Sequence, residues 1–108
     1  MYNEPKIGGF YYHYKHDPQG SVDNYAYKII NIGHHTEVEG LRESAMVIYA
    51  PLYAAAGVYK EGKHFDVRPL HMFLEEVTKD GKTFPRFREI TDPELIEKLK
   101  EKKEELYG

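Results

Sequence analysis

Three positively charged side chains in this sequence are candidates for binding an anion. Lys15 follows a run of tyrosines, Arg68 stands just before a proline, and Arg86 lies between two phenylalanines. A guanidinium group is a rigid fork of donors that matches a phosphate, and an aromatic ring can stack on a nucleobase. We therefore predict a small, non-catalytic binding domain for an anionic nucleotide-like molecule or a single-stranded nucleic acid. The predicted ligand-binding residues are Tyr12, Tyr14, Lys15, His34, His35, Tyr49, Tyr53, Arg68 and Arg86.

Six histidines suggest a second kind of chemistry, because imidazole titrates near neutral pH. His34 and His35 point to opposite sides of an extended chain, so they do not share a metal ion without a turn. His64 and Asp66 share a face but have no third ligand that can be assigned. Hence we predict neither a metal site nor a cofactor, and we assign no catalytic residue.

Two alternative functions stay open. His34 with Glu37 could form an acid–base pair, as in a small hydrolase or transferase that uses His34 or His35. A tyrosine-rich barrel could instead bind an extended peptide as a protein-interaction module.

The composition limits the compartment and the partners. The chain has 108 residues, including ten tyrosines, no tryptophan and no cysteine, with a net charge of −3. Without cysteine, disulfides and zinc–thiolate sites are excluded. Basic residues exceed acidic ones in residues 60–88, yet the chain as a whole is not a polycation, so strong generic binding to duplex DNA is not expected. No stretch reaches the roughly 20 apolar residues of a membrane span, and no signal-peptide core begins the chain, so we expect a cytoplasmic protein without a membrane partner.

Strands must position these side chains, and the apolar patterns predict a mainly β domain. Strands are expected over residues 9–15, 25–32, 45–49, 65–69, 74–78 and 84–87. Asp80 and Gly81 predict a two-residue hairpin turn between the last two strands. In the first strand, alternation predicts that one set of rings faces inward and that Tyr11, His13 and Lys15 face outward. The inward set is Phe10, Tyr12 and Tyr14.

The stretch from Phe65 to Phe73 is expected to close the domain. Proline holds the preceding residue extended and cannot donate to a sheet, so Pro69 should end a strand. The apolar residues around it should then fold back as a plug and leave Arg68 fixed at the strand end. The predicted plug consists of Val67, Leu70, Met72 and Phe73.

A helix is predicted at the C-terminus. Thr91 and Glu94 have the spacing of a capping box, and Pro93 suits the first helical turn. Leu95, Ile96 and Leu99 form a short apolar stripe, whereas residues 100–105 are charged. We expect the first half of the helix to dock and the second half to project into water. The stripe could also support an oligomer contact.

Five short motifs, in this order, resemble the DUF1653 family of small bacterial and phage proteins. They are residues 9–15, 33–37, 47–53, 67–73 and 85–87. The resemblance covers residues 8–90 and implies a small SH3-like barrel of about five to six antiparallel strands. The C-terminal α-helix predicted above lies outside this range, over residues 91–108, and is expected to pack on the barrel or to project from it. The family name records a domain of unknown function, so the resemblance implies little chemistry. The sequence departs from the family pattern in a longer loop over residues 54–64 and in Phe65, where tryptophan is common.

Overall fold

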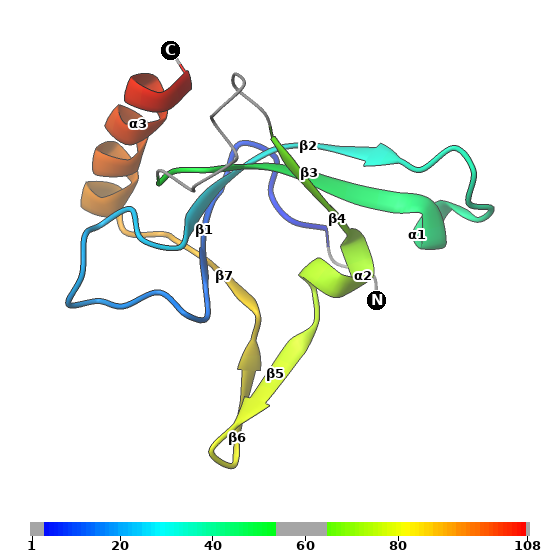
Figure 1. Cartoon of the computed structure of the whole chain (residues 1–108), viewed down its shortest axis with the longest axis horizontal. Helices are drawn as coiled ribbons and strands as arrows, with labels where there is room; N and C mark the ends of the chain where they lie inside the picture. The colour runs from blue at the N-terminus through cyan, green and yellow to red at the C-terminus, as the bar shows by residue number, and fades with distance from the viewer. Residues whose placement is uncertain (1–3, 54–64, 108) are drawn as a thin grey trace.

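The computed structural model describes residues 4–53 and 65–107. Within these ranges the chain forms two antiparallel sheets and three helices, of which only the last is long (Figure 1). The strands are β1 (Phe10–His13), β2 (Ala26–His34), β3 (Ala45–Pro51), β4 (Asp66–Pro69), β5 (Glu76–Lys79), β6 (Lys82–Pro85) and β7 (Phe87–Glu89). The helices are α1 (Leu41–Ser44), α2 (Leu70–Phe73) and α3 (Pro93–Tyr107).

The main sheet has five strands in the order β4-β3-β2-β1-β7, and it is strongly curved. A bulge between Ile29 and Asn31 interrupts the long β2–β3 pair, and bulges increase the local twist. In a flat sheet, four inter-strand spacings would separate the edge strands by about 19 Å. Yet the guanidinium carbon of Arg68, on β4, lies 5.5 Å from the ring centroid of Phe87, on β7. The two edges therefore face each other across a concave side.

The predicted antiparallel strands and the predicted C-terminal helix are confirmed. The prediction that the strands close into an SH3-like barrel is wrong. In the part of the chain that the structure describes, β4 and β7 are the two edges of an open sheet. The chain between them forms α2 and then the β5–β6 hairpin, which pairs only with itself. Figure 1 shows this hairpin projecting from the sheet, so no strand joins the two edges.

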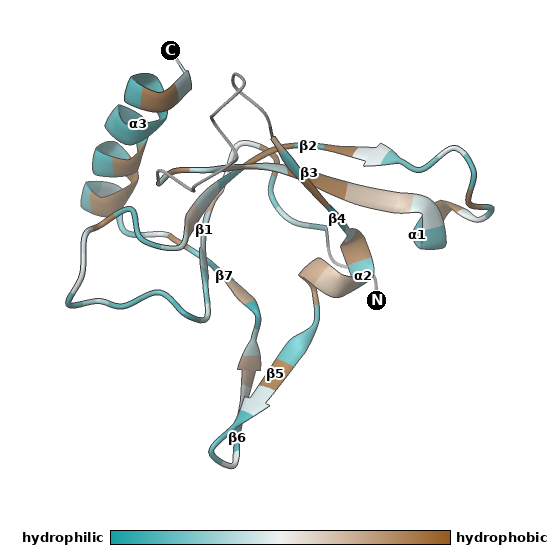
Figure 2. Ribbon diagram, viewed as in Figure 1, coloured by the Kyte–Doolittle hydropathy of each residue, from teal (hydrophilic) through white to brown (hydrophobic). Residues whose placement is uncertain are grey.

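Both faces of the main sheet are buried. The cluster on the concave face includes Tyr11, Tyr49 and Phe87 together with Leu70 and Phe73 of α2. The cluster on the opposite face is covered by α3 and contains Phe10, Tyr12, Ala26, Leu52, Ile90 and Leu99. Figure 2 shows hydrophobic segments on the strands and on the side of α3 that faces them. The predicted outward position of Tyr11 is therefore wrong, since the rings on both sides of β1 are in a core.

The turn after β4 follows the sequence prediction. β4 ends at Pro69, and α2 begins at the next residue. Only part of the predicted plug is buried, however. Leu70 and Phe73 are 1% and 2% exposed, whereas Val67 and Met72 are 55% and 39% exposed. A single helical turn places only one side of its residues against the sheet, so Met72 faces away.

α3 packs along the sheet over its whole length. Asp92 caps it, since its Oδ1 accepts the N–H of Glu94 at 2.9 Å; the cap is one residue beyond the predicted Thr91. Leu99 is fully buried, and at the other end Tyr107 donates a hydrogen bond to the carbonyl oxygen of Pro51 at 2.8 Å. The expectation that the second half projects into water is therefore wrong. No helix in the two described ranges is long and apolar enough to cross a membrane.

The β5–β6 hairpin has the turn that its sequence predicts. Lys79 pairs with Lys82, so the loop has two residues. Asp80 and Gly81 have φ angles of 54° and 75°, as a type I′ turn requires. At the other end of the hairpin the chain leaves β6 at Pro85 and enters β7 of the main sheet at Phe87. Arg86 thus lies at the junction of the two sheets.

Candidate functional site

Aromatic side chains line the concave side of the main sheet, and we call this surface the aromatic face. Phe87 lies among them, with its ring centroid 5.1 Å from that of His13, 5.7 Å from that of Tyr27 and 6.1 Å from that of Tyr49. Strand alternation explains the grouping, because His13 and Phe87 are paired neighbours on β1 and β7 and their side chains point to the same side. The aromatic face consists of His13, Tyr14, Tyr25, Tyr27, Tyr49, Tyr53 and Phe87.

Three tyrosines form the part of this face nearest to the start of β2. The hydroxyl groups of Tyr27 and Tyr53 are hydrogen-bonded at 2.6 Å. Burial raises the pKa of Tyr27 well above its usual value, and the bond to Tyr53 acts in the same direction. Burial also raises the pKa of Tyr53, so both phenols are neutral at physiological pH. Tyr25 lies 5.8 Å from Tyr53 and is 38% exposed, which leaves a ring surface on which a ligand ring could stack.

Arg68 reaches the aromatic face from β4. Its Nε donates a hydrogen bond to the hydroxyl oxygen of Tyr49 at 3.3 Å, and its guanidinium group lies over the ring of Phe87. Asp66, two residues earlier on the same strand, points to the same side. Burial raises the pKa of Asp66, while the charge of Arg68 acts in the opposite direction. Arg68 is therefore half-buried and held by the hydroxyl group of Tyr49 and the ring of Phe87.

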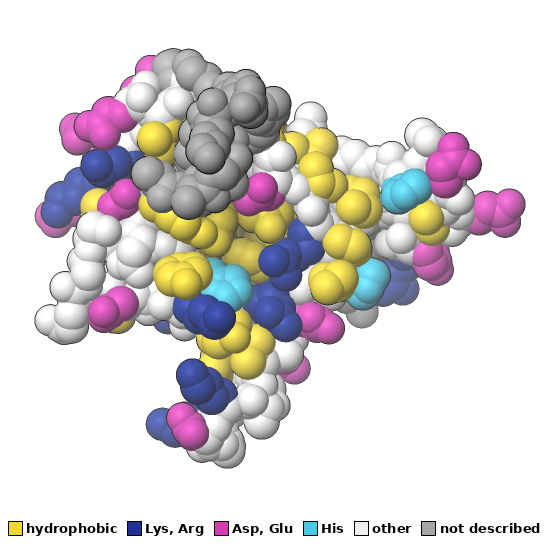
Figure 3. All heavy atoms as spheres, in the orientation of Figure 1, with side chains coloured by type: hydrophobic (Ala, Val, Ile, Leu, Met, Phe, Trp, Pro, Cys, Tyr) yellow, Lys and Arg dark blue, Asp and Glu magenta, His cyan; other side chains and the backbone are white. Residues whose placement is uncertain are grey.

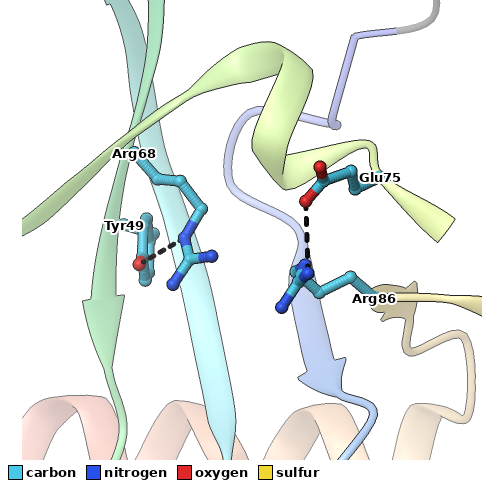
Figure 4. A network of polar contacts seen from close by, with 4 residues as sticks. All are labelled: Tyr49, Arg68, Glu75 and Arg86. Carbon is cyan, nitrogen blue, oxygen red and sulfur yellow. Dashed lines mark hydrogen bonds and ion pairs between the residues drawn. The ribbon is translucent and has the colours of Figure 1, made fainter. Parts of the chain in front are cut away.

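Arg86 reaches the same region from the junction of β6 and β7. One terminal nitrogen lies 3.1 Å from Oε1 of Glu75, and the guanidinium carbon lies 6.0 Å from the ring centroid of Tyr14. Its Nε is buried and has no hydrogen-bond partner among the residues that the structure describes. Figure 4 shows the side chains of Arg68 and Arg86 pointing toward one another. One of the two arginines is thus paired with a carboxylate, and the other is bound to Tyr49.

His13 lies among these cations. Burial lowers its pKa to about 4, and the positive charges of Arg86, Arg68 and Lys15 act in the same direction. Its Nδ1 accepts the backbone N–H of Lys15 at 3.2 Å. The neutral ring therefore carries its proton on Nε2 and can donate a hydrogen bond from there. Figure 3 shows Lys, Arg and His side chains gathered around hydrophobic ones near the base of the hairpin.

The structure brings most of the predicted site residues together. Five of them lie on or over the aromatic face: Tyr14, Tyr49, Tyr53, Arg68 and Arg86. Lys15 is exposed beside them, and its charge contributes to the shift of His13. Tyr12 lies on the opposite side of the sheet, where its hydroxyl donates to the carbonyl oxygen of Val22 at 2.8 Å.

His34 and His35 lie apart from the aromatic face, at the far end of β2. His34 Nδ1 is 2.9 Å from the hydroxyl oxygen of Ser44, and Ser44 is buried at the end of α1. His35 Nδ1 accepts the backbone N–H of Glu37 at 3.1 Å. Both rings therefore stabilise the corner between β2 and α1. The partner of His35 is the backbone N–H of Glu37, not its carboxylate.

Five residues of the site were missed by sequence reasoning: His13, Tyr25, Tyr27, Asp66 and Phe87. The sequence pattern places His13 on the outer face of its strand, and it indicates Phe87 only as a neighbour of Arg86. A signal was present in the i, i+2 pairs Tyr25–Tyr27 and Asp66–Arg68, because residues two apart on a strand share a face.

No group of three or more acidic or histidine side chains in the described ranges lies close enough to hold a metal ion. His64, which the sequence pairs with Asp66, lies outside those ranges, as does the rest of the loop over residues 54–64.

Comparisons with known proteins identify the family. A comparison with curated proteins gives no match. Among solved structures, the chain is similar to the crystal structure of a DUF1653 protein from Bordetella bronchiseptica, with a TM-score of 0.55 and 26% identity over 80% of this chain and 91% of that one. The model of the family described as proteins of unknown function (DUF1653) matches residues 9–89. The chain therefore belongs to the DUF1653 family.

Proposed function

We propose that the aromatic face binds an anionic ligand of the nucleotide class and that the domain acts by binding rather than by catalysis. The observation that carries this proposal is the position of Arg68 and Arg86. They come from distant parts of the chain, yet their side chains point toward one another over the aromatic face (Figure 4). A phosphate suits this pair of cations, because guanidinium groups bind phosphate oxygens through paired, charge-assisted hydrogen bonds.

The neighbouring groups support a ligand that has both charge and a ring. Tyr25 and Tyr14 offer ring surface that is not fully buried, which suits stacking on a nucleobase. His13 is neutral at physiological pH and offers an N–H donor. The family motifs of the sequence also meet here, since His13, Tyr49 and Arg68 belong to three separate motifs.

The two alternative functions lack a comparable observation. His34 and His35 are engaged in a structural corner away from the aromatic face. A groove for an extended peptide would also need a run of apolar pockets, whereas the rings of the aromatic face pack mainly on one another.

Isothermal titration of the protein with adenosine 5′-monophosphate (AMP) tests the proposal. Hydrogen bonds to charged groups contribute about 1.5–3 kcal/mol each, so Arg68→Ala and Arg86→Ala should each weaken binding by about tenfold or more. Lys100→Ala is the matched control, because Lys100 is exposed on α3 and its removal changes the net charge equally. Affinity that is unchanged in both arginine variants, or lowered equally in the control, would refute the proposal.

A further inference from the structure

A hollow adjoins the aromatic face, and we propose that it binds the second unit of a ligand with at least two nucleotides. This inference rests on the proposed function and makes the ligand a dinucleotide or a short single strand rather than a mononucleotide. We call this site the outer hollow. Its lining includes Tyr12, His13, Tyr14, His16, Phe84 and Arg88.

The outer hollow is lined from both sides of the sheet, because Tyr12 and its strand neighbour Arg88 belong to the side opposite the aromatic face, and two other residues link it to that face. His13 and Tyr14 line the hollow, and both belong to the aromatic face as well. The guanidinium group of Arg86 lies over the ring of Tyr14, at the boundary between the two sites. A phosphate bound by Arg86 would therefore lie where a linkage between two nucleotide units has to cross.

The size of the outer hollow fits one unit of such a ligand. Its volume is about 210 Å³, below the roughly 300 Å³ at which pockets for complete drug-sized ligands begin. A single base or sugar-phosphate group is smaller than such a ligand. The hollow thus suits one part of an extended molecule whose other part lies on the aromatic face.

The chemistry of the lining matches that of a nucleotide. Phe84, from the hairpin, and Tyr14 present rings whose centroids are 5.9 Å apart. Arg88 is exposed on β7, and no carboxylate of the described residues lies within ion-pairing distance of it. The hollow therefore combines ring surface with an available positive charge, the combination on which binding of single strands depends.

His16 adds a polar group with a fixed orientation. Its ring stacks on that of Tyr12 with centroids 3.5 Å apart, and its Nδ1 lies 2.7 Å from the carbonyl oxygen of Asn24. Because a carbonyl oxygen only accepts, Nδ1 carries a proton. Nε2 is therefore the ring nitrogen left to contact a polar group of a ligand, for example on a base or a sugar.

Isothermal titration with AMP and with the 5′-phosphorylated dinucleotide pApA tests this inference. The wild-type protein should bind pApA at least about fivefold more tightly than AMP, because one stacked base contributes about 1–3 kcal/mol. In Arg88→Gln and in Phe84→Leu the affinity for pApA should fall to that for AMP. Lys100→Gln should keep the difference in affinity between pApA and AMP. This control distinguishes binding in the outer hollow from general attraction between charges. Circular dichroism checks that each variant is folded.

The outcomes separate this inference from the proposed function. Equal affinity for AMP and pApA in the wild-type protein would overturn the second subsite and leave the aromatic face as the binding site. A preference for pApA that survives in folded Arg88→Gln and Phe84→Leu would overturn the assignment to the outer hollow. Absence of binding of both ligands would overturn the proposed function and this inference with it.

Discussion

On the aromatic face, the charge state of His13 is determined by the residues around it. His13 is a histidine that stays uncharged because burial removes water from it and three cations surround it. The sequence indicated the cations but assigned His13 to the outer side of its strand. Such an environment arises only when β4 and β7 approach each other, and sequence spacing does not reveal that approach.

This environment predicts a pH dependence of stability. The pKa of His13 is about 4 in the folded chain, whereas the ordinary pKa of a histidine is 6.5. Between these pH values the unfolded chain binds more protons at this residue, so the free energy of unfolding should fall as the pH falls from 6.5 to about 4. His13→Gln should reduce this fall. Thermal unfolding of both proteins, followed by circular dichroism at several pH values, measures the difference.

His71 provides the control for this measurement, since it is exposed on α2. His71→Gln should keep the pH dependence of the wild-type protein. An identical pH dependence in His13→Gln and the wild-type protein would show that His13 is not held uncharged by its surroundings.

Among the elements, local sequence signals predicted turns and strand ends better than they predicted contacts between elements. The Asp80–Gly81 turn and the end of β4 at Pro69 follow from backbone preferences of the residues themselves. The docking of α3 along its whole length does not. It involves Tyr107, whose hydroxyl reaches the carbonyl oxygen of Pro51 from a helical segment that is mostly charged.

The packing of α3 predicts a large effect of a core truncation. Leu99 is fully buried between α3 and the sheet, so Leu99→Ala should lower the free energy of unfolding by about 2–5 kcal/mol. Leu41 is 80% exposed on α1, and Leu41→Ala should change it by no more than about 0.5 kcal/mol. Urea denaturation measures both values. Similar values for the two variants would mean that α3 does not contribute to the core.

In the molecule as a whole, the open sheet has a concave side on which the proposed site lies. The sequence predicted the strand content, the C-terminal helix and the family, and it singled out the two arginines of the proposed site. It did not predict that the sheet stays open, because closure depends on how β4 and β7 pair at long range. The hairpin between them turns away from the sheet, which leaves Arg68 and Arg86 on opposite sides of one concave surface.

The most direct test of this account is a nuclear magnetic resonance titration of the ¹⁵N-labelled protein with AMP. The Nε–H signals of Arg68 and Arg86 and the ring signals of Tyr14 and Tyr25 should shift together and saturate at one ligand concentration. If the shifts were instead confined to the end of β2 around His34, or if none occurred, the aromatic face would not be the binding site.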